Sequence, residues 1–126
     1  MDEQVLVVDD DPDAQMILRR IVEILGLHPQ VASNGLEALD LLQDHEVELP
    51  SLVLLDLMMP GMNGFEVYNW LRGNPKTRQI PVVVVTACDS NQIDMFRLPG
   101  INGVIRKGDY AVDELMDMIK GILNFS

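Results

Sequence analysis

The sequence predicts an α/β fold built on a five-stranded parallel sheet with helices on both faces. Short apolar runs alternate with longer segments of helical period along the whole chain, which is the pattern of repeated βα units. Several of these runs end at an acidic or other polar residue, which is typical of the ligand-binding edge of such a sheet. The length of 126 residues, without any repeat, low-complexity tract or linker, predicts a single domain over residues 1–126.

Five strands are expected, each a short apolar run bounded by turn residues. The unbroken valine run in the fourth makes it the clearest, because helices on both faces of a parallel sheet leave its strands no exposed side. The predicted strands are Val5 to Val8, His28 to Ala32, Ser51 to Leu55, Pro81 to Val85 and Gly103 to Arg106. Their strict alternation with helices favours a doubly wound, flavodoxin-like sheet in the order 2-1-3-4-5.

Five helices are expected around this sheet. Asp11 caps the first, Pro12 occupies its first position, and Gly26 ends it. The fourth is predicted to be short and weak, because Pro99-Gly100 interrupts it. The second helix is expected after Asn34-Gly35 and the third from about Gly64 to Arg72. The weak fourth helix is expected near Asn91 to Arg97, and the fifth from about Asp109 onward.

The charge balance and the cysteine content exclude several classes of function. Nine basic and twenty acidic residues give a net charge of -11, which repels a nucleic-acid backbone and an anionic membrane surface. No apolar run approaches the roughly 20 residues of a membrane-spanning helix. The single cysteine, Cys88, excludes an internal disulfide, and the amino terminus lacks a secretory signal. We therefore expect a cytoplasmic protein that binds neither nucleic acid nor membranes by itself.

Acidic residues follow the first and third predicted strands. Asp9 and Asp10 come directly after the first, and Asp56 comes directly after the third. In the 2-1-3-4-5 order these strands are neighbours, so the three carboxylates should converge at the switch point of the sheet. Two such charges about 4 Å apart repel by roughly 4 kcal/mol at an effective dielectric near 20. A cation would relieve this repulsion, and hard oxygen ligands with room for water favour Mg²⁺.

Two more polar residues are expected at the same edge of the sheet. Thr86 ends the fourth strand and Lys107 follows the fifth. A hydroxyl donor and a positive charge beside a metal-bound carboxylate are what the positioning and charge stabilisation of phosphoryl transfer require. Taken alone, each of these residues has an ordinary structural explanation, and only their arrangement together points to phosphate chemistry.

At these residues the chain resembles the receiver domains of two-component response regulators, and the resemblance covers nearly all 126 residues. It rests on the start Val5 to Asp11, the run Asp56 to Gly64, the strand end Val85-Thr86-Ala87, and Lys107. The resemblance implies a receiver domain over residues 1–126 that acts as a phosphoacceptor signalling switch. It implies no enzyme beyond slow phosphoryl transfer and hydrolysis on the domain itself.

The resemblance also implies roles for the individual residues. Asp56 would be the phosphoacceptor, with Thr86 and Lys107 as its catalytic partners. Asp10 would bind Mg²⁺ or Mn²⁺ directly, Asp9 through water, and Met58 through its backbone carbonyl. A sensor histidine kinase or a histidine phosphotransfer protein would donate the phosphoryl group. The output would pass to a downstream protein or an appended domain, because the receiver is either free-standing or part of a longer regulator or hybrid kinase.

Two departures from the family pattern lie near the fifth strand. Gly108 follows Lys107 where family members usually carry a cis-proline, and a cis bond without proline costs about 3 to 4 kcal/mol. Val104 stands where the family commonly carries an aromatic ring that swings inward on activation. We therefore expect a signal carried by backbone and helix shifts. They would bias a two-state surface of the fourth helix, fifth strand and fifth helix as Thr86 moves toward the phosphate.

Two alternative functions remain open from the sequence. The first is an aspartate-nucleophile phosphatase or phosphomutase of the haloacid-dehalogenase kind, a family that needs a second acid two residues after its nucleophile. This chain has Met58 at that position, and it has too few residues for a substrate cap. The second is a receiver-like interaction module that is not controlled by phosphorylation. Gly108 and Val104 keep this second alternative open, and the clustered acids argue against it.

Overall fold

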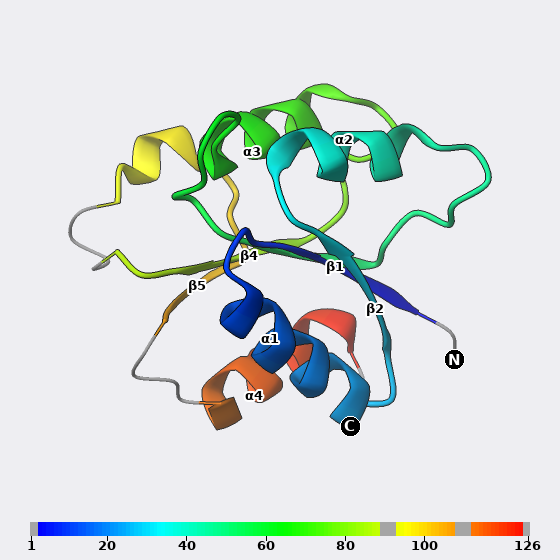
Figure 1. Cartoon of the computed structure of the whole chain (residues 1–126), viewed down its shortest axis with the longest axis vertical. Coiled ribbons are helices and arrows are strands. Elements are labelled where there is room, and N and C mark those ends of the chain that lie inside the picture. The colour runs from blue at the N-terminus through cyan, green and yellow to red at the C-terminus, as the bar shows by residue number, and fades with distance from the viewer. Residues whose placement is uncertain (1–2, 89–92, 108–111, 125–126) are drawn as a thin grey trace.

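The computed structural model describes residues 3–88, 93–107 and 112–124, which form a five-stranded parallel sheet with helices on both faces (Figure 1). The strand order is β2-β1-β3-β4-β5, which confirms the predicted topology. The strands are β1 (Gln4–Val8), β2 (His28–Ala32), β3 (Leu52–Leu55), β4 (Val82–Thr86) and β5 (Gly103–Arg106). Each lies within one residue of its predicted bounds.

The α-helices of the described residues form two layers. Helices α2 and α3 cover one face of the sheet, and α1 and α4 cover the other (Figure 1). They are α1 (Pro12–Ile24), α2 (Gly35–Gln43), α3 (Gly64–Gly73) and α4 (Val112–Leu123). The side chains of Asp11, Asn34 and Asn63 cap the first three by accepting backbone N–H groups. None of these helices is long and apolar enough to cross a membrane.

The expectation of five α-helices is wrong between β4 and β5, where the described residues form only the 3-10 helix η2 (Met95–Arg97). Pro99 cannot continue a helix, and Gly100 follows it with a φ of 76°. All three residues of η2 are exposed, and the buried Ile93 and Leu98 lie outside it. The η2 residues themselves therefore offer no apolar face to pack on the sheet and stabilise a longer helix. Residues 91 and 92 of the predicted helix lie outside the described residues. The expected start of the last helix near Asp109 lies outside them too.

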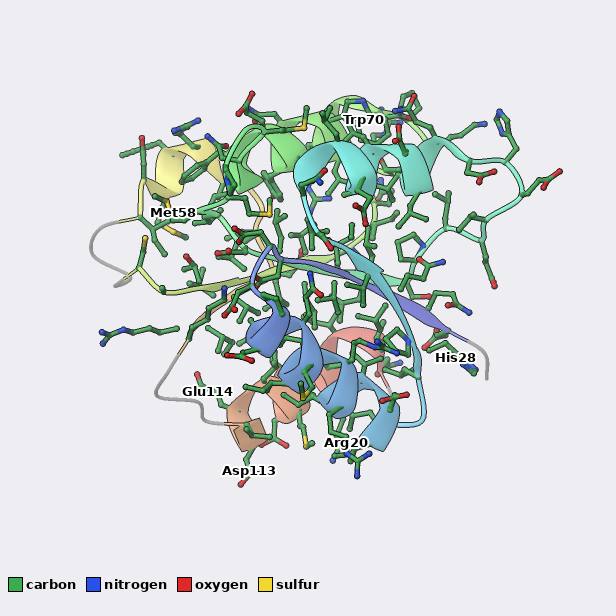
Figure 2. The ribbon with its side chains drawn as sticks, in the orientation of Figure 1. Arg20, His28, Met58, Trp70, Asp113 and Glu114 are labelled. Carbon is green, nitrogen blue, oxygen red and sulfur yellow. The ribbon has the colours of Figure 1, made fainter. Side chains whose placement is uncertain are left out.

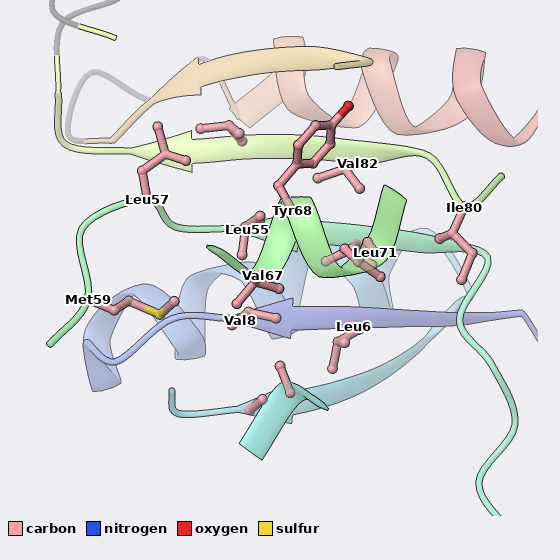
Figure 3. Packing of buried hydrophobic residues seen from close by; sticks show 14 of the residues in the cluster. Leu6, Val8, Leu55, Leu57, Met59, Val67, Tyr68, Leu71, Ile80 and Val82 are labelled. Atoms are coloured by element: carbon pink, nitrogen blue, oxygen red, sulfur yellow. The ribbon is translucent and has the colours of Figure 1, made fainter. Parts of the chain in front are cut away.

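Two hydrophobic cores hold the layers together, one on each face of the sheet. Leu6 and Val8 of β1 belong to the core under α2 and α3, whereas Val5 and Val7 belong to the core over α1 and α4. Figure 3 shows the first core, where α3 packs its buried side chains against the strands. A slip of one residue would move every strand side chain into the opposite core. This fixed register places the carboxyl ends of the strands at one edge.

Candidate functional site

The sheet itself positions the candidate site, because its hydrogen-bond ladder continues past the strand ends. The Asp9 N–H donates to the carbonyl of Ala32 at 3.1 Å, and the Asp56 N–H donates to the carbonyl of Val8 at 3.0 Å. At the other side of the site, the Lys107 N–H donates to the carbonyl of Thr86 at 2.7 Å. All five strands therefore hold the backbone of these residues in a fixed relation to one another.

The three acids converge as the topology predicts. Carboxylate oxygens of Asp9, Asp10 and Asp56 all lie within 4.8 Å of one another. The side chains of Asp9 and Asp56 are 0% and 4% exposed, whereas Asp10 is exposed. Two buried negative charges at this separation need a compensating positive charge.

Lys107 supplies a positive charge to both buried acids. Its Nζ lies 2.7 Å from Oδ2 of Asp9 and 3.3 Å from Oδ2 of Asp56. The ammonium group therefore bridges the two carboxylates from the side of β5. Apart from this ion pair, the buried Oδ2 of Asp9 accepts no hydrogen bond within the described parts of the chain.

Burial and charge shift the protonation equilibria of Asp56 and Lys107. Burial raises the pKa of Asp56; the Lys107 ammonium lowers it, and the Asp9 carboxylate raises it, so the net shift is upward. Burial alone would lower the pKa of Lys107, but the carboxylates of Asp9 and Asp56 outweigh it and raise this pKa above 10.5. Lys107 is therefore charged at neutral pH, and the ionised form of Asp56 is disfavoured until another cation joins it.

Met58 and Thr86 both lie between Asp56 and Lys107 in the chain. Thr86 is fully buried at the end of β4, the strand between those that lead to Asp56 and Lys107, and its Oγ1 accepts the Cys88 N–H at 3.4 Å. Met58 follows Asp56 in the β3–α3 loop. Its N–H donates to Oδ1 of Asp56 at 3.3 Å, and its side chain is 62% exposed.

Two residues that support the site were not identified from the sequence. Gln15 of α1 donates from Nε2 to the carbonyl of Asp9 at 2.6 Å and to Oγ of Ser33 at 3.1 Å. Gly64 opens α3, its N–H donates to the carbonyl of Leu57, and a Cβ built on it would lie 2.2 Å from the carbonyl oxygen of Asp56. No local pattern marks Gln15, whereas Gly64 belongs to the segment that carries the family resemblance.

The donor set fits a hard divalent cation. Three carboxylates offer oxygen ligands within a small space, and the exposed side chain of Asp10 leaves one side open to water. Mg²⁺ and Mn²⁺ prefer such ligands and keep several waters. The Oδ2 of Asp9, buried and without a hydrogen bond beyond its ion pair, is an anionic oxygen that a cation or a hydrated cation would satisfy.

Of the two departures from the family pattern near β5, the structure describes Val104 and not Gly108. Val104 is half-buried and packs against the core under α2 and α3, beside Val84 of β4. A branched aliphatic side chain therefore fills the inward position on β5. Gly108 lies outside the described residues.

Comparisons with known proteins point to one family. The family model described as response regulator receiver domain matches residues 5–120. A polar-differentiation response regulator, DivK from Brucella anthropi, is 35% identical over 108 residues, which cover 86% of this chain and 79% of DivK.

Two solved structures of similar proteins were determined with a divalent metal bound. The Mn²⁺-bound form of response regulator Rcp1 has a TM-score of 0.78 and 25% identity, with 98% of this chain and 93% of that chain covered. Response regulator TrrA from Thermotoga maritima, in complex with Mg²⁺-BeF, has a TM-score of 0.78 and 27% identity, covering 95% and 98% of the two chains. The fold of this chain thus resembles that of two regulators whose structures hold a divalent metal.

Proposed function

The chain belongs to the response regulator receiver domain family, and from that premise we propose that it is a phosphorylation switch whose phosphoacceptor is Asp56. A receiver domain is a regulatory signalling domain and not a classical enzyme. The observation that carries the proposal is the position of Asp56. Its carboxylate lies within 4.8 Å of those of Asp9 and Asp10 and 3.3 Å from Nζ of Lys107.

Asp9, Asp10, Asp56 and the carbonyl of Met58 are the residues that would hold Mg²⁺ or Mn²⁺. When bound, the cation neutralises the acids, favours the ionised form of Asp56 and draws charge from the phosphoryl oxygens. The Mn²⁺ in Rcp1 and the Mg²⁺-BeF in TrrA support this assignment. The direct role of Asp10 fits its exposure, and the water-mediated role of Asp9 fits its burial behind the Lys107 ammonium.

The transfer step follows from the side chains around Asp56. A carboxylate oxygen of Asp56 forms a bond to phosphorus while the phosphorus–nitrogen bond of a phosphohistidine breaks. The leaving imidazole keeps the electron pair and takes up a proton. Lys107, already 3.3 Å from Oδ2 of Asp56, would move onto a phosphoryl oxygen, and the hydroxyl of Thr86 would donate to another. Such preorganised donors stabilise charge on the transferring group.

The donor is a histidine kinase or a histidine phosphotransfer protein, and α1 offers the surface on which it would dock. A groove of about 810 Å³ runs along α1 from Pro12, next to the acidic site, to Ile24, and Val112 of α4 borders it. Met16 and Ile24 along this groove are 68% and 60% exposed. An apolar stripe that starts at the reacting edge can pack against a helix of the donor and bring its histidine to Asp56.

The switch would act on the segment that follows β4. Phosphorylation adds about 1.5 to 2 negative charges beside Asp56, and Thr86 moving toward them would pull the connection to η2. Val104 already occupies the inward position on β5, so the output would depend on the backbone around η2 and β5. A cytoplasmic setting is part of the proposal, and the free thiol of Cys88 agrees with it.

Phosphorylation with a small donor tests the proposal. The protein is incubated with acetyl phosphate with and without Mg²⁺, and intact mass and released phosphate are followed. We expect one phosphoryl group per chain, dependent on Mg²⁺, retained in Asp40→Asn and lost in Asp56→Asn. Asp40 is an exposed acid of α2, so it is the matched control. Many turnovers would indicate an enzyme, and no labelling would indicate a module that is not controlled by phosphorylation.

A further inference from the structure

A second groove lies between the β3–α3 loop and η2, on the side of the molecule opposite the α1 groove. It encloses about 480 Å³, and Met58, Met59, Phe65 and Arg97 contribute to its lining. Met58 is labelled in Figure 2, where it projects from the loop beside η2. Phe96 and Met95 on η2 are 98% and 46% exposed. The replacement of the fourth helix by η2 therefore leaves an apolar surface next to the phosphoacceptor loop.

Arg97 is the charged residue of this groove. Its guanidinium carbon lies 4.1 Å from the centre of the Phe65 ring, so α3 holds it by one face. Within the described ranges no carboxylate pairs with it. Two acids close to Arg97 and Phe65 in sequence accept hydrogen bonds at helix starts: Asp94 accepts the Phe96 N–H, and Glu66, next to Phe65, accepts the Asn63 N–H. The guanidinium N–H groups of Arg97 thus form no ion pair with either of these acids.

From these contacts we propose that this groove docks an apolar segment of a downstream protein that carries one carboxylate for Arg97. Methionine side chains adapt to an aliphatic or aromatic anchor, and a guanidinium whose stacking is already fixed pairs with a carboxylate in a defined geometry. The net charge of -11 on this chain favours a partner that is neutral or basic overall, with the acid confined to the docking segment. The same charge disfavours an anionic membrane as the occupant.

Met58, which lines the groove, also contacts Asp56. The link to phosphorylation drawn from this contact rests on the proposed function. The Met58 N–H donates to Oδ1 of Asp56 at 3.3 Å, so a phosphoryl group on Asp56 changes the acceptor that orients Met58. The opposite wall, η2, follows the segment after Thr86. Phosphorylation would therefore move both walls, and partner affinity would differ between the two states.

Defined peptides test the docking surface on the unphosphorylated full chain. The probes are short acetylated alanine-rich peptides with one leucine, isoleucine or phenylalanine and one glutamate a helical turn before or after it. Amide chemical shifts are followed by NMR. We expect perturbations that gather in residues 57–65 and 95–98, and a loss of affinity of roughly tenfold in Arg97→Glu. Arg78→Glu is the matched control, because Arg78 is an exposed arginine outside the groove.

Charge exchange provides the decisive comparison. Peptides with lysine in place of glutamate should bind Arg97→Glu better than they bind the natural chain. Perturbations along α1 instead, equal binding by Arg97→Glu and Arg78→Glu, or no binding by any peptide would overturn the docking surface. The coupling is tested separately by repeating the titration with acetyl phosphate and Mg²⁺. An affinity that changes in the natural chain but not in Asp56→Asn supports it, and an unchanged affinity overturns the coupling while the docking surface stands.

Discussion

The buried position of Asp56 disfavours its ionised carboxylate in the folded protein. Burial and the Asp9 carboxylate raise its pKa above 3.8, although Lys107 opposes the shift. A raised pKa in the folded state means that folding favours the protonated form. The stability from this group is therefore fully present below its ordinary pKa and is lost as the pH rises through the raised value. At neutral pH, ionised Asp56 destabilises the metal-free protein.

Asp56→Asn should accordingly stabilise the metal-free protein at neutral pH. We expect the free energy of unfolding to rise on the order of 1 kcal/mol, because a buried negative charge is removed while Asp9 keeps its ion pair with Lys107. The gain should shrink as the pH falls through the raised pKa of Asp56 toward 3.8, because the natural side chain becomes protonated in the folded protein over that range. Urea unfolding with a chelator present measures both. Asp40→Asn should change little, and a less stable Asp56→Asn at neutral pH would mean that attraction by Lys107 dominates.

Helix α3 begins and ends with glycine, and only one of the two is required by its surroundings. A Cβ on Gly64 would lie 2.2 Å from the carbonyl oxygen of Asp56 and 2.7 Å from Cα of Leu57, both backbone atoms. A Cβ on Gly73 would meet nothing within 4 Å. The close approach at Gly64 lets α3 start directly against the backbone of Asp56 and Leu57, so this glycine sets the position of the helix relative to the candidate site.

Alanine at these two positions gives a matched pair. Gly64→Ala should lose at least about 3 kcal/mol of stability, because the overlap is with backbone and cannot relax by a rotamer change. Gly73→Ala should be neutral or stabilising by up to about 1 kcal/mol, since alanine is the better helix former. Urea unfolding compares them, and circular dichroism shows whether Gly64→Ala folds. Equal stabilities would mean that the β3–α3 loop yields readily.

If the α1 groove docks the phosphoryl donor, changes in it should affect a protein donor and not a small-molecule donor. Replacing Met16 and Ile24 together by serine should slow phosphoryl transfer from a histidine phosphotransfer protein by roughly tenfold. Labelling by acetyl phosphate should not change, because the small donor needs no docking surface. Leu36→Ser, at an apolar side chain of α2 that is 64% exposed, should affect neither. A parallel loss of labelling with both donors would instead indicate damage to the site.

Elements that bury both faces could be predicted from sequence, and those that depend on distant partners could not. The runs that form β3 and β4 are apolar throughout because helices cover both their sides. The segment at Met95 has no such constraint, and whether it forms an α-helix or a 3-10 helix depends on tertiary packing. The same limit applies to Tyr68, which donates to the carbonyl of Pro99 and accepts from Arg72, a link between α3 and the turn before β5.

At the scale of the whole molecule, topology explains why the site could be predicted. Asp9 and Asp56 are far apart in sequence, but β1 and β3 are neighbours, so one strand order brings their carboxylates together. Lys107 was expected at the same edge, and its bridging of the two acids is a finding of the structure. The alternation of elements favours this strand order, whereas the pairing of side chains depends on the three-dimensional structure.

The net charge of -11 makes salt a confounding influence on stability, and this allows a sharp test of the metal site. Mg²⁺ that binds only the folded state should raise the free energy of unfolding by RT ln(1 + [Mg²⁺]/Kd), about 2.7 kcal/mol at a hundredfold excess over Kd. NaCl at equal ionic strength screens the repulsion without occupying the site. We expect the natural chain to gain more from MgCl₂ than from NaCl, and Asp9→Asn and Asp10→Asn to lose most of that difference. Thermal unfolding measures it across a concentration series. If the two salts stabilise all three proteins equally, the acids repel one another without binding a cation, and phosphorylation of Asp56 would have to proceed without one.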